Sequence, residues 1–437
     1  MTRSHTRRAV SLAALLFLIL LCLLMLSTGG TSVDLARADL IEANQQQGRL
    51  MQALYQVSVA ADRQGWTPEL LRLAGDLWYA AGNVSRALPY WEAASPQLPD
   101  DALLRRRLAE AYLAMQRWPE AVDQLIWLVE QDPDDAWIQF HLGVLRAAFD
   151  PQAAQAHLQA AAGTSQYRTA ASALLRVIRD HTADPLIGMP VGLVLAEAEM
   201  WPYAELAFRH AADVGQAYAE ALAYAGLARD RQGKDGREWV NRAVGLEPQN
   251  AVVRFVQGLH LRAQDDLTGS LDALVLAAAL DPANPAYYAE LGTAYWLVDD
   301  LENAERWLRV AVDMSNHDLR FQQLLALFYA EESASLAEGG ISELEVMATL
   351  MPDDPEVQAG LGWALYQSGR REAALEALDA VLGRLPEHPR SLFYKARIYL
   401  ETGSPAEARA LLERVAALDS PVQAEARRML DGLGDAG

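Results

Sequence analysis

The segment from residue 285 to residue 318 reads PAYYAELGTAYWLVDDLENAERWLRVAVDMSNHD. This segment predicts two amphipathic helices separated by the polar pair Asp299 and Asp300. One face of the first helix is apolar at one-turn spacing, and the second helix has an apolar stripe at i, i+4 and i+7. Neither helix can bury its apolar face alone, so each needs a neighbour. The residues of the two faces are Leu291, Gly292 and Tyr295, then Ala304, Leu308 and Ala311.

The same pattern recurs along the chain with a period of 34 residues. Gly258 precedes Gly292 by 34 positions, and Ala277 precedes Ala311 by the same interval. A closing proline repeats with this spacing, and it ends the second helix of a pair because proline cannot continue a helix. This pattern of small residues, aromatic residues and a closing proline resembles the tetratricopeptide repeat. The proline pairs are Pro99 and Pro133, Pro248 and Pro282, and Pro352 and Pro386.

The resemblance implies an all-α fold, an α-solenoid of stacked antiparallel helix pairs. Units can be placed over residues 34–163 and again over 185–420, and residues 421–437 are expected to form a capping helix and tail. Between the two arrays, residues 164–184 break the 34-residue phase. There the stretch from Tyr167 to Asp180 predicts one extra helix or a bend, since no partner helix follows in the frame.

The N-terminus precedes the repeats and has the pattern of a membrane anchor. Residues 1–9 contain Arg3, Arg7 and Arg8 without an acidic residue, and residues 10–27 carry no charge. Eighteen helical residues span about 27 Å, close to the thickness of a bilayer core. The pattern predicts a single-pass signal-anchor with residues 1–9 in the cytoplasm and the repeat domain outside it. A cleaved signal peptide is the alternative.

Composition limits the kinds of partner and site. The formal net charge of -21 argues against nucleic acid as a partner, because phosphates need cationic surfaces. One cysteine, Cys22, leaves no internal disulfide and no cysteine-based metal site. Lysine occurs only at Lys234 and Lys395, and arginine supplies the other positive charges, a bias typical of a bacterial genome.

The residues that could carry chemistry have structural explanations. Acidic pairs such as Asp134–Asp135 fall at turns between helices, where aspartate caps the next helix. The histidines form no paired metal spacing, although His141 and His157 could meet across a hairpin. No nucleophile, phosphate or dinucleotide motif is present. We therefore expect no catalytic residue, no cofactor and no metal.

The resemblance also implies a binding surface. In tetratricopeptide proteins the first helix of each pair lines the concave face, and its second, fifth, ninth, twelfth and thirteenth positions commonly contact ligands. Applied to this chain, these positions include Tyr79, Phe140, Glu356 and Glu401. Aromatic residues and arginine dominate interface hot spots, which favours the C-terminal half. The alternative is that Trp296 and Trp363 only pack between units. The predicted groove residues are Phe255, Leu259, Arg262, Trp296, Trp363, Tyr366, Phe393 and Arg397.

These features predict a membrane-anchored protein–protein interaction scaffold rather than an enzyme. The repeats occupy the chain from residue 34 to its end and leave no room for a catalytic domain. The groove would hold a protein or peptide partner outside the cytoplasm, in the assembly of an envelope or secretion complex. The alternatives are a secreted chaperone or carrier after signal cleavage, and a non-catalytic accessory subunit of a glycan-processing enzyme.

Overall fold

The computed structural model describes residues 49–181, 184–216, 218–316, 318–332 and 340–434. Over these residues it contains 23 α-helices, one short 3-10 helix and no strand. The expectation of an all-α helical solenoid is confirmed. The predicted anchor at residues 10–27 lies outside the described residues, and among the helices that are described none is both long and apolar enough to cross a bilayer.

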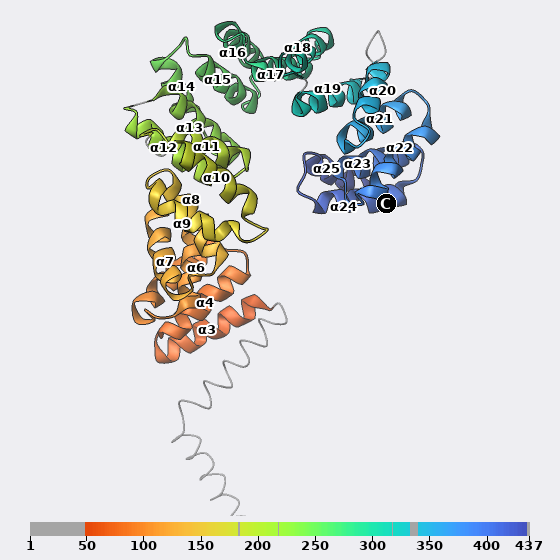
Figure 1. The fold of residues 1–437 in the computed structure, drawn as a ribbon. Helices are drawn as coiled ribbons and strands as arrows, with labels where there is room; N and C mark the ends of the chain where they lie inside the picture. Colours follow the sequence, from red (N-terminus) through yellow and green to blue (C-terminus); the bar gives the residue numbers. More distant parts are fainter. Residues whose placement is uncertain (1–48, 182–183, 217, 317, 333–339, 435–437) are drawn as a thin grey trace, which may run out of the picture. The chain divides into compact units, whose positions relative to one another are not determined.

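The chain divides into two compact units, Met1–His210 and Ala211–Gly437. In each unit, helices that follow one another in sequence pack as hairpins (Figure 1). The helices of the first unit are α3 Leu50–Gln64, α4 Pro68–Ala80, α5 Val84–Ala94, η1 Ser95–Gln97, α6 Ala102–Ala114, α7 Trp118–Gln131, α8 Ala136–Ala147, α9 Pro151–Ala162, α10 Arg168–Asp180, α11 Gly188–Glu197 and α12 Trp201–Val214, which ends just past the boundary.

The second unit continues the succession of hairpins to the C-terminal helix. Its helices are α13 Ala219–Arg231, α14 Arg237–Leu246, α15 Ala251–Ala263, α16 Leu267–Leu280, α17 Pro285–Leu297, α18 Leu301–Met314, α19 Leu319–Glu332, α20 Gly340–Leu350, α21 Pro355–Gln367, α22 Arg371–Arg384, α23 Pro389–Glu401, α24 Pro405–Ala417 and α25 Gln423–Gly434.

Aspartates at the turns begin the helices by capping them. The Asp135 carboxylate accepts hydrogen bonds from the backbone amides of Trp137 and Ile138, at 2.8 and 3.2 Å. Asp300 and Asp354 cap α18 and α21 in the same way. Each cap satisfies amides that have no partner within the helix. The structural interpretation of the acidic pairs is confirmed.

Glycines in the first helix of a hairpin allow the second helix to approach closely. A methyl group at Gly292 of α17 would lie 2.8 Å from Leu308 Cγ and 3.0 Å from the Leu308 backbone nitrogen. Leu308 is buried on α18, and so are Ala304 and Ala311. Because one of the atoms in the way is backbone, the hairpin cannot accept a larger residue by moving a side chain. The predicted role of Gly292 is confirmed.

Substitution of this glycine should therefore destabilise the second unit. We expect Gly292→Ala to lower the free energy of unfolding by about 2 kcal/mol, through overpacking against α18. Gly245→Ala is the matched control, because this exposed glycine of α14 has no atom within 4 Å of the added methyl group. The control should stabilise by about 0.5–1 kcal/mol, as alanine favours helix more than glycine does. Urea unfolding measures the free energy of unfolding of both variants. Changes of the same sign in the two variants would contradict the packing explanation.

Helix α10 adds an element between the hairpin α8–α9 and the hairpin α11–α12, in the stretch where the 34-residue frame is lost. After it, α12 lies against α7 and α8. The ring of Tyr203 on α12 is 5.3 Å from that of Trp118 on α7, and its hydroxyl is 2.7 Å from Nδ1 of His141 on α8. These contacts join residues about 60 to 85 positions apart. They are more distant in sequence than contacts between neighbouring hairpins.

Candidate partner-binding face of the second unit

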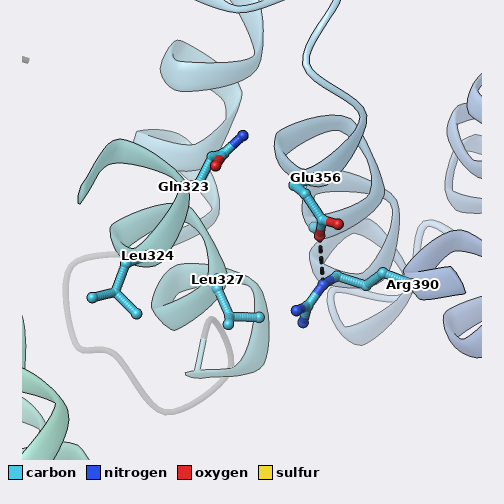
Figure 2. Close-up of a pocket in the computed structure, with 6 residues that line it drawn as sticks. Gln323, Leu324, Leu327, Glu356 and Arg390 are labelled. Carbon is cyan, nitrogen blue, oxygen red and sulfur yellow. Dashed lines mark hydrogen bonds and ion pairs between the residues drawn. The ribbon is translucent and has the colours of Figure 1, made fainter. Parts of the chain in front are cut away.

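Helices α19, α21 and α23 lie next to one another and together form what we call the α19–α23 face. They enclose a pocket of about 270 Å3 (Figure 2). Gly360 allows α21 to approach α19, because a methyl group there would lie 3.1 Å from Ala330 Cβ. Two leucines form one wall of the pocket, and polar side chains occupy the others. The lining residues are Gln323, Leu324 and Leu327 of α19, Glu356 and Gly360 of α21, and Arg390 of α23.

An ion pair joins α21 and α23 within the pocket. Arg390 Nε donates to Glu356 Oε2 at 2.6 Å (Figure 2). Burial alone would raise the pKa of Glu356, but the His388 hydrogen bond and the Arg390 charge outweigh it and hold that pKa below its usual value. Burial likewise works against the charge of Arg390, but Tyr394 and Glu356 raise the pKa of the guanidinium. Both groups are therefore charged at neutral pH.

His388 fixes the orientation of this carboxylate. Its Nδ1 accepts from the backbone amide of Ser391 at 3.3 Å, as the N-cap of α23. The ring proton is therefore on Nε2, which donates to Glu356 Oε1 at 3.2 Å. One buried histidine thus begins α23 and positions the acid that faces Arg390.

A second cluster lies further along the same three helices. The guanidinium of Arg397 lies 3.9 Å from the centre of the Trp363 ring, within the range of a cation–π contact. Trp363 stacks on Tyr394 with ring centres 5.3 Å apart. Glu331 accepts from the Tyr394 hydroxyl at 2.7 Å and from Arg397 at 3.4 Å. The structure therefore brings the predicted residues Trp363 and Arg397 together.

Not all predicted groove residues are accessible. Trp363 and Phe393 are only 2% and 1% exposed, and Leu259 is also buried, so these three side chains pack between helices. The other predicted residues keep part of their surface. Those are Phe255, Arg262, Trp296, Tyr366 and Arg397.

Those on α15 and α17 have partners within the unit. Arg262 pairs with Glu290 at 2.7 Å, and Trp296 Nε1 donates to Glu332 at 2.9 Å. Phe255 packs on Tyr287 with ring centres 4.9 Å apart. Within the described part of the chain, none of these three side chains lines the pocket on the α19–α23 face.

Sequence reasoning missed five of the six residues that line the pocket. Arg390, Gln323 and Leu327 occupy the second, fifth and ninth positions of their units, so the positional rule contained their signal. The hot-spot preference for aromatic residues and arginine gives no weight to Gln323 and Leu327. Leu324 and Gly360 each occupy the sixth position of their unit, for which the rule gives no signal. Glu356 was among the positions considered.

His141 and His157 of the first unit have separate partners. His141 bonds the Tyr203 hydroxyl at 2.7 Å, and His157 Nδ1 bonds Gln139 Oε1, also at 2.7 Å. Within the described residues, no group of three or more histidine, cysteine, aspartate or glutamate side chains is placed to hold a metal ion.

His141 should make the first unit sensitive to acid. Burial, helped by the charge of Arg106, lowers the pKa of His141 from 6.5 to about 4. The unfolded chain therefore takes up a proton below about pH 6.5 that the folded chain accepts only near pH 4. The contribution of the neutral His141 ring to stability is fully present above the pKa that this ring has in the unfolded chain. It is lost as the pH falls towards the lower pKa of the ring in the folded chain. Between about pH 7 and pH 5 the free energy of unfolding should fall by about 2 kcal/mol from this group alone.

The measurement compares urea unfolding of the natural chain and of His141→Gln at the two pH values. Glutamine keeps a polar partner for Tyr203 but does not titrate. Other acidic groups titrate equally in both proteins, so the loss on acidification should be about 2 kcal/mol smaller in the variant. An equal loss in both proteins would show that His141 is not the sensitive group.

Comparisons with known proteins match two parts of the chain to one family. Residues 79–139 and residues 360–422 each match a model described as a tetratricopeptide repeat. The first match runs from the end of α4 into α8, and the second runs from within α21 to just past α24 and includes Arg390. Among curated proteins, none matches the chain significantly.

Solved structures with low sequence identity align over most of the chain. Yeast Tom70 is 12% identical, with 86% of this chain and 96% of that chain aligned and a TM-score of 0.42. The Cut9–Hcn1 hetero-tetramer of APC/C is 14% identical over 90% and 94%, with a TM-score of 0.44. A tetratricopeptide repeat protein from Parabacteroides merdae is 12% identical over 60% and 98%, with a TM-score of 0.45. From the two family matches, the chain carries tetratricopeptide repeats over residues 79–139 and 360–422.

Proposed function

We propose that this chain is a non-catalytic scaffold that holds an extended segment of a protein partner on the α19–α23 face. Tetratricopeptide repeats are modules of protein–protein interaction. The observation that carries the proposal is the pocket of about 270 Å3, which combines an apolar wall with fixed polar groups. Such a pocket suits one apolar side chain of a bound segment, with the polar groups setting its direction.

The polar groups of the pocket favour recognition of peptide backbone. Glu356 and Arg390 already neutralise one another, so the pocket offers no unbalanced charge to select an ion. Gln323 donates its side-chain amide to Asp354 Oδ2 at 2.7 Å. Its carbonyl oxygen is therefore left to accept a hydrogen bond, and a backbone amide of an extended segment is a suitable donor.

Selection from a random peptide display library on the full chain tests this proposal without knowledge of the natural partner. We expect enriched peptides that share one large apolar residue and bind with dissociation constants in the range of about 1–100 μM. Selection that enriches no binding peptide contradicts the proposal. Enrichment of peptides that bind equally well when a larger side chain fills the pocket would also contradict the proposal.

We also propose that residues 10–27 hold this scaffold at a bacterial membrane, with the repeats outside the cytoplasm, where an envelope or secretion complex is assembled. The uncharged run VSLAALLFLILLCLLMLS after three arginines supports this assignment. This assignment is tested by expressing the full chain in a bacterial host, extracting the membranes with alkali and measuring the intact mass of the protein. A membrane-bound chain of full mass is the expected result, and a shortened protein in the soluble fraction would instead indicate the secreted form.

A further inference from the structure

A second pocket lies in the first unit, formed by α7, α8 and α12. Its volume is about 560 Å3, and it exists because α12 lies back against α7 and α8. The pocket is distinct from the α19–α23 face and does not depend on the proposed function. Its lining residues are Trp118, Pro119, Val122 and Asp123 of α7, Leu145 and Arg146 of α8 with Phe149 just after it, and Leu206 of α12.

Apolar side chains make up most of this lining. Phe149 is 48% exposed and packs on His210 with ring centres 4.3 Å apart. Trp118 and Leu206 are half-buried, so each leaves apolar surface open to the pocket. Pockets of about 300–1,000 Å3 with mostly apolar walls and few polar groups are typical of small-molecule sites. Size and lining therefore favour a small ligand with an apolar body.

Arg146 supplies a positive charge that lacks a carboxylate partner within the described part of the chain. Its Nη1 lies 3.1 Å from Nε2 of His157. A guanidinium only donates, so Nε2 must accept and the proton of the ring must be on Nδ1. That Nδ1 donates to Gln139 Oε1 at 2.7 Å. Burial and the charge of Arg146 lower the pKa of His157, which keeps the ring neutral.

Arg146 is thus oriented by a neutral group rather than neutralised by an acid. A half-buried cation beside an apolar wall has lost part of its hydration, and a carboxylate would restore the lost interactions with charge-assisted hydrogen bonds. The other charged lining residue, Asp123, is exposed, so water screens its charge. The chemistry that fits the pocket is an apolar chain or ring that carries one carboxylate.

We propose that the α7–α8–α12 pocket binds a small amphiphilic carboxylate, with its apolar body against Trp118, Val122 and Leu206 and its carboxylate on Arg146. The expected ligands are aliphatic or aromatic monocarboxylic acids of moderate size. A salt bridge to Arg146 would select acids over alcohols and amines of the same length.

Calorimetry on the full chain with three ten-carbon probes tests the proposal, each below its micelle concentration. Decanoate should bind at least about tenfold more tightly than decanol, because a charge-assisted pair contributes this much or more to affinity. Decylamine should bind more weakly still, since its charge repels Arg146. Equal affinity for the three probes, or no binding of decanoate, would overturn the proposal.

Variants of the full chain localise the site. Arg146→Gln should reduce decanoate binding to the level of decanol, Arg146→Lys should keep the preference for the acid, and Val122→Phe should weaken decanoate and decanol alike by filling the pocket. Arg176→Gln is the matched control, since Arg176 is exposed on α10 away from the pocket. Circular dichroism confirms folding of each variant. A preference for decanoate that survives Arg146→Gln would assign the binding elsewhere and overturn the proposal.

Discussion

Asp230→Ala should be among the most destabilising single substitutions in the second unit. Asp230 of α13 and His260 of α15 form a buried pair, with Oδ2 and Nδ1 2.7 Å apart and side chains 2% and 3% exposed. The other carboxylate oxygen accepts from the backbone amide of Gly236, at the start of α14, at 3.0 Å. One carboxylate therefore connects three helices. Its removal leaves the histidine and the amide buried without this partner, and we expect a loss of about 3–5 kcal/mol in the free energy of unfolding.

Amide hydrogen exchange gives the most direct measurement, since it reports the loss helix by helix. Protection should fall most in α13, α14 and α15. Asp272→Ala on α16 is the matched control, because Asp272 is exposed and should change stability by less than about 0.5 kcal/mol. His260→Ala and the double variant complete a double-mutant cycle. The double variant should lose much less free energy of unfolding than the sum of the losses in the two single variants. Additive losses would show that the two residues do not act as a pair.

The hairpins could be predicted from sequence because their determinants are local. A helix pair needs apolar residues at one-turn spacing, a small residue where the helices approach and a cap at the turn, and each signal lies within one 34-residue unit. Gly292 and Leu308 illustrate this, since their contact joins two helices separated by a short turn. Local signals of this kind are also why Asp300 could be assigned as a cap.

The α7–α8–α12 pocket could not be predicted in the same way. It depends on Tyr203 and Leu206 lying against helices formed far earlier in the chain. Helix α10 interrupts the succession of hairpins before α12, and the 34-residue repeat pattern carries no information about which earlier helices α12 then contacts. Contacts at such sequence separation follow from the folded geometry of the intervening helices.

Burial explains why the groove prediction was only partly informative. The same repeat position can place a side chain on the open face or between two helices, depending on the size of its neighbours. Trp363 is held against Tyr394 and covered by Arg397, so it forms the floor of a cluster rather than its surface. Smaller residues at equivalent positions, such as Leu327, line the pocket instead. Judged by residue type alone, Trp363 is the better candidate for a partner contact. Judged by access to solvent, Leu327 is the better candidate.

Closing the pocket on the α19–α23 face should abolish binding of the selected peptides. Leu327 lies across the pocket from the Glu356–Arg390 pair (Figure 2), and a tryptophan at this position would occupy much of the cavity of about 270 Å3. We expect Leu327→Trp to weaken peptide binding at least about tenfold, because the apolar anchor of the peptide loses its site. Fluorescence anisotropy with a labelled peptide from the selection measures the change.

Leu350→Trp is the matched control, since it makes the same substitution on α20 at a side chain that is 73% exposed and outside the pocket lining. The control should leave the dissociation constant within about twofold, because exposed positions away from an interface contribute little to affinity. Both variants must retain the helical circular dichroism of the natural chain. If Leu327→Trp binds as the control does, the peptide lies elsewhere on the repeats, and the scaffold must use a face other than the one that α19, α21 and α23 form.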